Sequence, residues 1–218
     1  IKGLRDKKFF AFTLAEVLIT LGIIGVVAAM TMPVLTASSR KSEYSARLKK
    51  YYSSMQQAVL LYNQDHNMLP EDWPIPDDGY DSLKSFWDTR FAPYFSNVIS
   101  IEKDNEDDPL IRLADGTSLK IRKGAVVDII YDVNGDKAPN QDGKDRYWFL
   151  LNKGTFSAYG WTEDIGTVHV PDEDEEPYTK DMNDRDNVLR LCKKSGSFCS
   201  QLLLLDGWEF KNDYPNKI

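Results

Sequence analysis

The sequence has few of the side chains that metal centres and hydrolases commonly use, with two histidines and two cysteines among 218 residues. Neither His66 nor His169 neighbours a Ser or Cys in a known nucleophile motif. Cys192 and Cys199 have no histidine nearby, so they supply too few ligands for structural zinc. A phosphate-binding glycine loop is also absent from the sequence. We therefore expect a protein that is not an enzyme and carries no resident cofactor.

Basic residues are also in the minority, with 27 Lys and Arg against 34 Asp and Glu and a formal net charge of -7. Several of the basic residues lie within the first eight positions, so the rest of the chain is more acidic still. Such a balance argues against a broad surface for nucleic acid, because phosphate backbones are bound by Lys and Arg.

One long stretch lacks charge almost completely. Phe12 to Leu35 contains a single ionisable residue, Glu16, and as a helix it can cross a hydrocarbon core of roughly 30 Å. Residues 1–11 are basic, which favours their retention in the cytoplasm and export of the rest of the chain. A secretory signal has its small residue after the apolar run, whereas here Ala11 precedes it. We therefore expect the apolar helix to remain on the mature protein.

Glycine and proline are absent between Thr36 and Met68, and the helical pattern continues there. Apolar residues recur at steps of three and four and form one stripe: Tyr44, Leu48, Tyr51, Met55, Val59 and Tyr62. The pattern predicts one helix from about Phe12 to Asn67, apolar all round in its first half and amphipathic in its second.

The sequence after Met68 predicts a second, short helix and then a sheet. Prolines from Pro70 onward end the long helix, and apolar spacing favours a helix from Asp81 to about Tyr94. About four or five strands follow the acidic stretch EKDNEDDP, with turns at Asp115-Gly116 and at Asn152-Lys153-Gly154. Residues 168–187 are charged and predict an exposed loop. Residues 201–210, QLLLLDGWEF, are compatible with a helical turn or an edge strand, and the pattern does not decide between them.

The run KKFFAFTLAEVLITLGIIGVVAAMTMP resembles the prepilin cleavage and methylation signature of type IV pilins and type II secretion pseudopilins. The resemblance implies an α+β pilin-like fold, in which a long N-terminal helix packs on an antiparallel sheet. It also implies cleavage between Ala11 and Phe12 by a prepilin peptidase, followed by N-methylation of Phe12. Ala11 stands where Gly is usual, but it is also small. The predicted organisation is a leader at 1–11, a transmembrane and filament-core helix at 12–35, and an exported part at 36–218, which comprises an amphipathic helix at 36–68, a connector at 70–108, a sheet at 109–160 and a cysteine region at 161–218.

Glu16 is the residue with the clearest implied role. A carboxylate in an apolar span costs on the order of a few kcal/mol in lipid, and such residues persist where a partner neutralises them. Cleavage creates that partner, because the new Phe12 amine of one subunit can pair with Glu16 of its neighbour. The implied function is a structural subunit, major or minor, of a pilus, competence filament or secretion pseudopilus at the bacterial inner membrane. The implied partners are other pilin or pseudopilin subunits, the prepilin peptidase, the inner-membrane assembly platform and the lipid bilayer.

A second class of function stays open beside the filament subunit. A membrane-tethered module that binds surfaces or carbohydrate, and never polymerises, would carry the same anchor.

The residues Gly22, Gly25 and Pro33 within the apolar helix have two interpretations. In the resembling family a segment between such residues melts on assembly, while Gly and Pro are also common in transmembrane helices for packing reasons.

Two further segments resemble parts of pilin-like proteins. DVNGDKAPNQDGKDRYWF, residues 132–149, resembles a loop of secretion pilins, and its alternating oxygen side chains suit Ca²⁺: Asp132, Asn134, Asp136, Asp142 and Asp145. It is not an EF-hand, and a solvated turn of Asx and Gly is the favoured interpretation. CKKSGSFCSQLLLLDGWEFKNDYP resembles the cysteine-bounded end segment of pilins, which implies a disulfide between Cys192 and Cys199.

Overall fold

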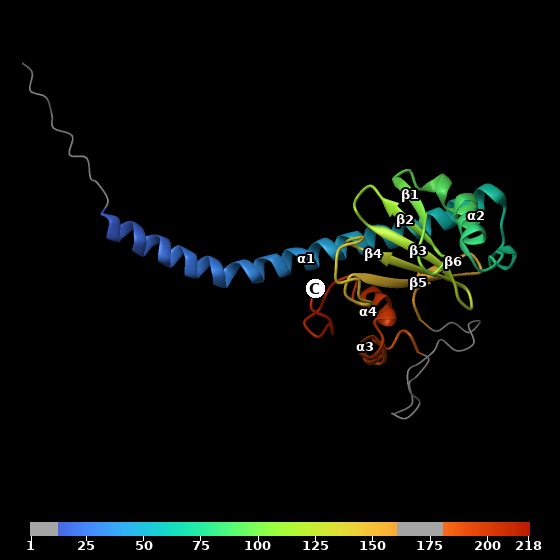
Figure 1. The fold of residues 1–218 in the computed structure, drawn as a ribbon. Helices are drawn as coiled ribbons and strands as arrows, with labels where there is room; N and C mark the ends of the chain where they lie inside the picture. The colour runs from blue at the N-terminus through green and yellow to red at the C-terminus, as the bar shows by residue number, and fades with distance from the viewer. Residues whose placement is uncertain (1–12, 161–180) are drawn as a thin grey trace, which may run out of the picture. The chain divides into compact units, whose positions relative to one another are not determined.

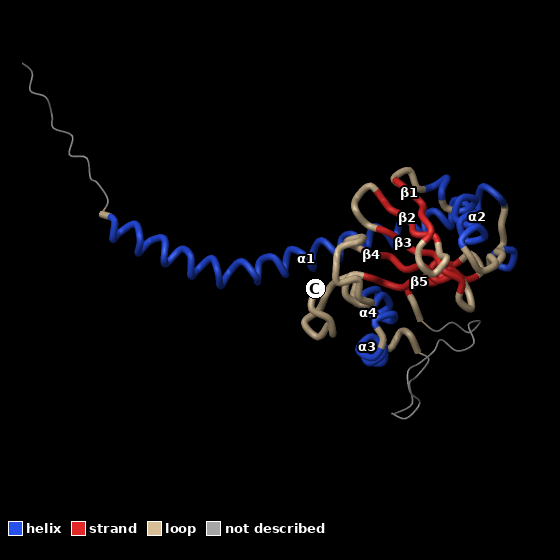
Figure 2. Tube along the Cα trace, in the orientation of Figure 1, coloured by secondary structure: helices blue, strands red, loops and turns tan. Residues whose placement is uncertain are grey.

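The computed structural model describes residues 13–160 and 181–218 (Figure 1). The chain divides after Arg40 into an N-terminal unit and a compact unit, Lys41–Ile218, which we call the head. The helices are α1 (Leu14–His66), α2 (Tyr80–Arg90), α3 (Arg185–Lys194) and α4 (Cys199–Leu205), with short 3-10 turns at Pro70–Asp72, Ala92–Tyr94 and Gly196–Phe198. The strands are β1 (Val98–Lys103), β2 (Pro109–Leu113), β3 (Ser118–Lys123), β4 (Val127–Asp132), β5 (Arg146–Asn152) and β6 (Thr155–Ala158). Helices and strands are segregated along the chain (Figure 2), which confirms the predicted α+β class.

The six strands form one antiparallel sheet in chain order, from β1 to β6. Both predicted turn sequences connect neighbouring strands, β2 to β3 and β5 to β6. Gly116 has φ +81° and Gly154 has φ +63°, and glycine adopts these left-handed values without steric cost. The short turns in the sequence predict that each strand pairs with the next one, and the sheet has this order.

The sheet has one strand more than predicted at its beginning. β1 (Val98–Lys103) lies in the segment 70–108 that the sequence predicted as a helical connector. Its residues are only partly buried because it is an edge strand, so its apolar alternation is weak. A bulge between Val98 and Ser100 interrupts the pattern further.

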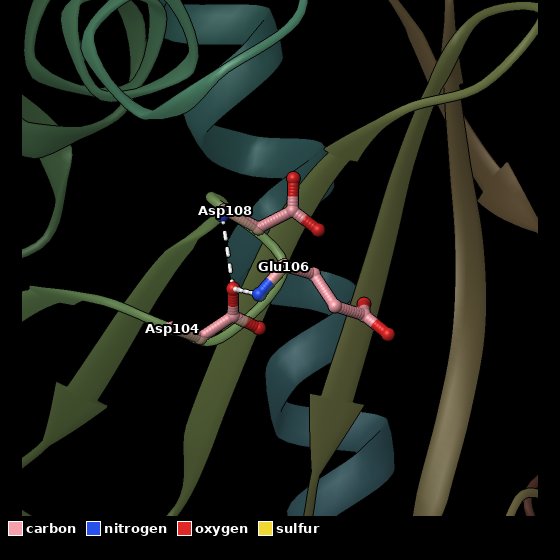
Figure 3. Close-up of side chains that lie close together, drawn as sticks. All are labelled: Asp104, Glu106 and Asp108. Atoms are coloured by element: carbon pink, nitrogen blue, oxygen red, sulfur yellow. Dashed lines mark hydrogen bonds between the residues drawn. The ribbon is translucent and has the colours of Figure 1, made fainter.

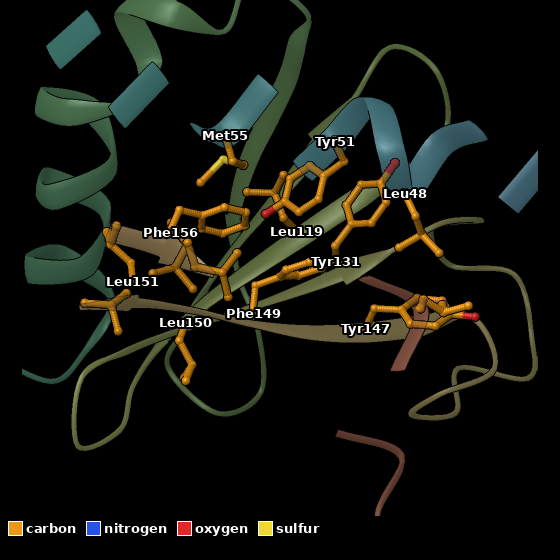
Figure 4. Packing of buried hydrophobic residues seen from close by; sticks show 14 of the residues in the cluster. Leu48, Tyr51, Met55, Leu119, Tyr131, Tyr147, Phe149, Leu150, Leu151 and Phe156 are labelled. Atoms are coloured by element: carbon orange, nitrogen blue, oxygen red, sulfur yellow. The ribbon is translucent and has the colours of Figure 1, made fainter. Parts of the chain in front are cut away.

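The head half of α1 packs against one face of the sheet. Residues that pair across the strands alternate between this face and the opposite one, and Leu119, Tyr131 and Tyr147 point toward α1 and are buried. Tyr51 of α1 stacks on Tyr131 with ring centroids 3.9 Å apart, and it meets Phe149 edge to face at 5.3 Å. Figure 4 shows these rings packed between the helix and the strands. All six residues of the predicted apolar stripe are buried in this core.

Two helices differ from the expectations. α2 ends at Arg90, short of the predicted Tyr94, because Pro93 lacks an amide hydrogen and a 3-10 turn takes over. α3 begins at Arg185, so the last residues of the predicted loop 168–187 are helical, while residues 161–180 lie outside the described residues. The side chain of Asp184 caps α3 by accepting from the backbone amides of Asp186 and Asn187. Within 201–210, the open choice resolves as helix, since α4 runs to Leu205.

Candidate assembly site

The described part of the chain begins just after the predicted processing site. Ala11 and Phe12 lie outside the described residues, and the first described residue is Thr13. The structure therefore describes only the residues after the predicted cleavage position, and these include Thr13 and Glu16.

Thr13 and Glu16 form a reciprocal cap at the start of α1. Glu16 Oε2 accepts from the backbone nitrogen of Thr13 at 2.8 Å and from Thr13 Oγ1 at 2.9 Å. In return, Thr13 Oγ1 accepts from the Glu16 backbone nitrogen at 3.2 Å. This is a capping box, which satisfies two amides that the first turn of a helix leaves without intrahelical partners. Thr13 was not among the predicted site residues, although the spacing Thr-x-x-Glu before an apolar run is the signal for such a cap.

Beyond this cap the apolar side chains of α1 are exposed in the single chain. α1 is long and apolar enough to cross a membrane, and its most apolar window is 0% buried. The exposed residues include Leu18, Ile19, Leu21, Ile23, Ile24, Met30 and Leu35. An apolar surface of this kind on a soluble protein marks an interaction site, so this segment needs lipid or other helices around it.

The glycines of this segment are not required by the chain's own packing. A Cβ placed on Gly22 or Gly25 would meet nothing within 4 Å. Both residues and Pro33 lie within α1. Neither melting on assembly nor close packing against another helix is tested by the structure, and both stay predictions.

The four aspartates predicted to bind Ca²⁺ have protein partners, whereas the buried Oδ1 of Asn134 has none among the described residues. The buried carboxylate of Asp145 accepts from the backbone nitrogens of Asn140 at 2.9 Å and Gln141 at 2.6 Å. Asp132 Oδ1 accepts from the backbone nitrogen of Asn134 at 3.0 Å, and burial raises the pKa of Asp132 to about 7.

The other two carboxylates of this loop form ion pairs. Asp136 pairs with Arg112, and Asp142 Oδ1 lies 3.2 Å from Arg146 Nε. These contacts are typical of an Asx-rich turn. Calcium binding stays a prediction, and calorimetry at millimolar Ca²⁺ would test it.

Within residues 13–160 and 181–218, three acidic side chains come within 4.8 Å of one another: Asp104, Glu106 and Asp108. They lie in the turn between β1 and β2, where Asp104 Oδ1 accepts from the backbone nitrogens of the other two at 2.9 Å each (Figure 3). Lys120 Nζ pairs with all three, at 2.6 Å from Asp104 Oδ2 and 3.2 Å from Asp108 Oδ2. A lysine ammonium therefore occupies the centre of this cluster.

The disulfide region and the 132–145 loop pack together. Cys192 of α3 and Cys199 of α4 form a disulfide. Gly143 of the loop lies against it with φ +75°, and a Cβ there would lie 2.6 Å from Cys199 Sγ. Tyr214 Oη and Asn216 Nδ2 donate to the Gly143 carbonyl at 2.5 and 3.0 Å. The sequence did not predict this contact, because it depends on tertiary packing.

The sequence also matches two protein-family models. Residues 6–32 match the prokaryotic N-terminal methylation motif, which is the prepilin-type signature of type IV pilins and pseudopilins. The motif and the apolar helix together define a pilin-like class, whose members are processed, membrane-anchored subunits that associate with prepilin peptidase and other pilin subunits. Proteins of this class are normally structural and non-enzymatic.

The rest of the chain has its own family assignment. Residues 34–218 match a family of unknown function (DUF6613), and the chain belongs to that family. No curated protein and no solved structure matches the chain. The methylation motif therefore carries the functional inference, and the family match covers the head.

Proposed function

We propose that this protein is a structural subunit, a pilin or pseudopilin, of a type IV pilus or a type II secretion filament. The observation that carries the proposal is the methylation motif at 6–32, which overlaps an exposed apolar helix that begins at Leu14 and contains one acidic side chain, Glu16. On this proposal a prepilin peptidase cuts between Ala11 and Phe12, and the mature subunit is drawn from the inner membrane into a filament through α1.

The chemistry of assembly would centre on Glu16. In lipid an isolated carboxylate is costly, and an ammonium group is the simplest partner that removes the cost. Phe12 acquires an amine on cleavage, and pairing it with Glu16 of a neighbour would set the axial register between subunits. In the single chain the same carboxylate is held by Thr13, so assembly would exchange or share those hydrogen bonds.

The capping box allows a sharp test of the charge. Glu16→Gln keeps a side chain that can complete the cap but removes the negative charge. Thr13→Val keeps the charge and removes the hydroxyl of the cap. We expect Glu16→Gln to abolish incorporation into sheared filaments, measured by immunoblot, while Thr13→Val reduces it only modestly. Equal loss in both variants would assign Glu16 to helix capping and contradict the proposal.

Mass spectrometry of the native protein tests processing. We expect a chain that starts at Phe12, carries one extra methyl group and lacks two hydrogens because of the Cys192–Cys199 disulfide. A natural product that retains residues 1–11 would overturn the proposal.

The alternative, a tethered binding module that does not polymerise, makes the opposite prediction for Glu16. Such a module should keep its cellular activity in Glu16→Gln, because the anchor and the head are unchanged. A filament subunit should lose that activity together with its incorporation.

A further inference from the structure

The sheet face that points away from α1 carries a groove of about 560 Å³. Strand pairing aligns four of its residues in one row across β2, β3, β4 and β5: Leu110, Lys120, Ile130 and Trp148. A second row follows beside it, with Ser118, Asp132 and Arg146. The β1–β2 turn and the 132–145 loop form the walls. Figure 3 views this face, with α1 behind the strands.

The groove differs from an ordinary solvated sheet face in how far its residues are covered. Ile130 in its floor is 8% exposed and Asp132 is 7% exposed. The side chains of Lys120 and Asp104 are only 17% and 18% exposed, although both are charged. Side chains that are held in place by neighbours lose little freedom when a ligand binds, so this groove is organised before binding.

Most of the charged side chains that line the groove form ion pairs. Lys120 holds Asp104 and Glu106, and Arg146 pairs with Asp142. Asp136 pairs with Arg112, which lies outside the groove lining. A cationic ligand would have to displace Lys120 or Arg146 from its carboxylates, whereas an anionic ligand would meet several carboxylates at close range. A neutral ligand can bind without displacing any of these ion pairs, so a neutral ligand fits best.

The floor also offers an aromatic surface. Trp148 lines the groove, and the guanidinium of Arg122 lies 5.9 Å from the centre of its ring. The indole Nε1 of Trp148 is covered and has no hydrogen-bond partner among the described residues. Aromatic rings bind the apolar C–H faces of sugars, while carboxylates accept from and guanidinium groups donate to sugar hydroxyls.

From these features we infer that the groove is a binding site for a neutral oligosaccharide, with Trp148 as the stacking surface and the paired carboxylates and cations as hydroxyl partners. Its size lies within the range of small-molecule sites, which suits a few sugar rings. The sheet face involved is the one that α1 leaves uncovered. Binding therefore requires neither filament formation nor cleavage.

Titration calorimetry of the full chain tests the site, in a detergent whose head group is not a sugar. The probes are the neutral hexasaccharides cellohexaose, chitohexaose and maltohexaose, with hexalysine and hexagalacturonate as charged comparators. We expect sub-millimolar binding of at least one neutral probe and at least tenfold weaker binding in Trp148→Ala. Binding of only a charged probe, or of none of the five, would overturn the inference.

Two exposed neighbours on β3 give a matched control that does not disturb the core. Arg122 lines the groove and Lys123 does not, and both are exposed. Arg122→Ala should weaken binding of the neutral probe several-fold, and Lys123→Ala should leave it unchanged. If Trp148→Ala does not fold, Arg122→Ala and Lys123→Ala still test the inference. Equal effects of these two variants on binding would contradict the proposed binding site. Glu16→Gln should bind like the parent protein, so the result is independent of the proposed filament.

Discussion

Both parts of α1 carry large apolar side chains, but these side chains are buried to very different extents. In the N-terminal unit Leu21 is 60% exposed, whereas in the head Leu48 is 0% exposed. The head half meets a sheet from its own chain, and its apolar residues form a single stripe. The N-terminal half is apolar around its whole circumference and finds no such partner in the described residues. A helix that is apolar all round requires an apolar environment, which here must come from lipid or neighbouring subunits.

The largest expected change in stability comes from substitutions that compare the two halves of α1. Leu48→Ala should lower the free energy of unfolding of the head by about 2–5 kcal/mol, because it leaves a cavity between helix and sheet. Leu21→Ala should change it by less than about 0.5 kcal/mol, since Leu21 takes no part in the head's core. Urea unfolding in detergent, followed by tryptophan fluorescence, measures both. A comparable loss in both variants would show that the N-terminal unit and the head unfold together.

The second prediction concerns the C-terminal part of the head. Replacing both Cys192 and Cys199 with Ala should lower the free energy of unfolding by about 2–3 kcal/mol, because the short loop they close is then free in the unfolded chain. The expected loss is confined to the head, so the helicity of the N-terminal unit should not change. Unfolding with and without reductant measures the effect, and reductant should have no effect on the double variant. An unchanged parent protein in reductant, with its thiols shown to be free, would contradict this prediction.

The third prediction uses pH. Burial raises the pKa of Asp132 to about 7, above its value in the unfolded chain of about 4. Between these values the folded state binds the extra proton, so stability falls as pH rises from about 4 to about 7. Asp132→Asn removes this loss and should stabilise the protein by about 1–3 kcal/mol at pH 8, with little change at pH 4.

Urea midpoints at the two pH values measure this difference. Asp145→Asn is the contrasting variant, because each of the two Asp145 oxygens accepts from a backbone nitrogen, so an amide nitrogen would face one of those donors. It should destabilise the protein at both pH values. If the two variants changed the stability in the same way at both pH values, the two carboxylates would not differ in environment as described.

Sequence reasoning recovered the parts of the fold that depend on local pattern. The stripe from Tyr44 to Tyr62 predicted which face of α1 is buried, because helical periodicity alone decides it. β1 was missed since an edge strand buries too little to show alternation, and α3 was missed within a charged segment that the composition favoured as loop. Each of these depends on contacts with residues distant in the sequence.

The candidate sites divide in the same way. Glu16 and the methylation motif are contiguous, so the sequence alone located them. The groove combines Lys120, Ile130 and Trp148 from three strands, and only the register of the sheet brings them into one row. The turn lengths that set this register could not be fixed from composition, so the sequence did not predict the groove.

The smallest expected effect compares glycines in the two regions. Gly22→Ala should raise the stability of the isolated α1 helix by about 0.5–1 kcal/mol, since a Cβ there meets nothing and alanine favours helix more than glycine does. Gly143→Ala should instead destabilise the head, because its φ is +75° and Cys199 Sγ blocks the new carbon. Circular dichroism in detergent measures the first change and urea unfolding the second. If glycine at position 22 serves contact with another subunit, Gly22→Ala will also reduce incorporation into filaments while the single chain becomes more helical. Greater helicity with unchanged incorporation would assign Gly22 no role in assembly.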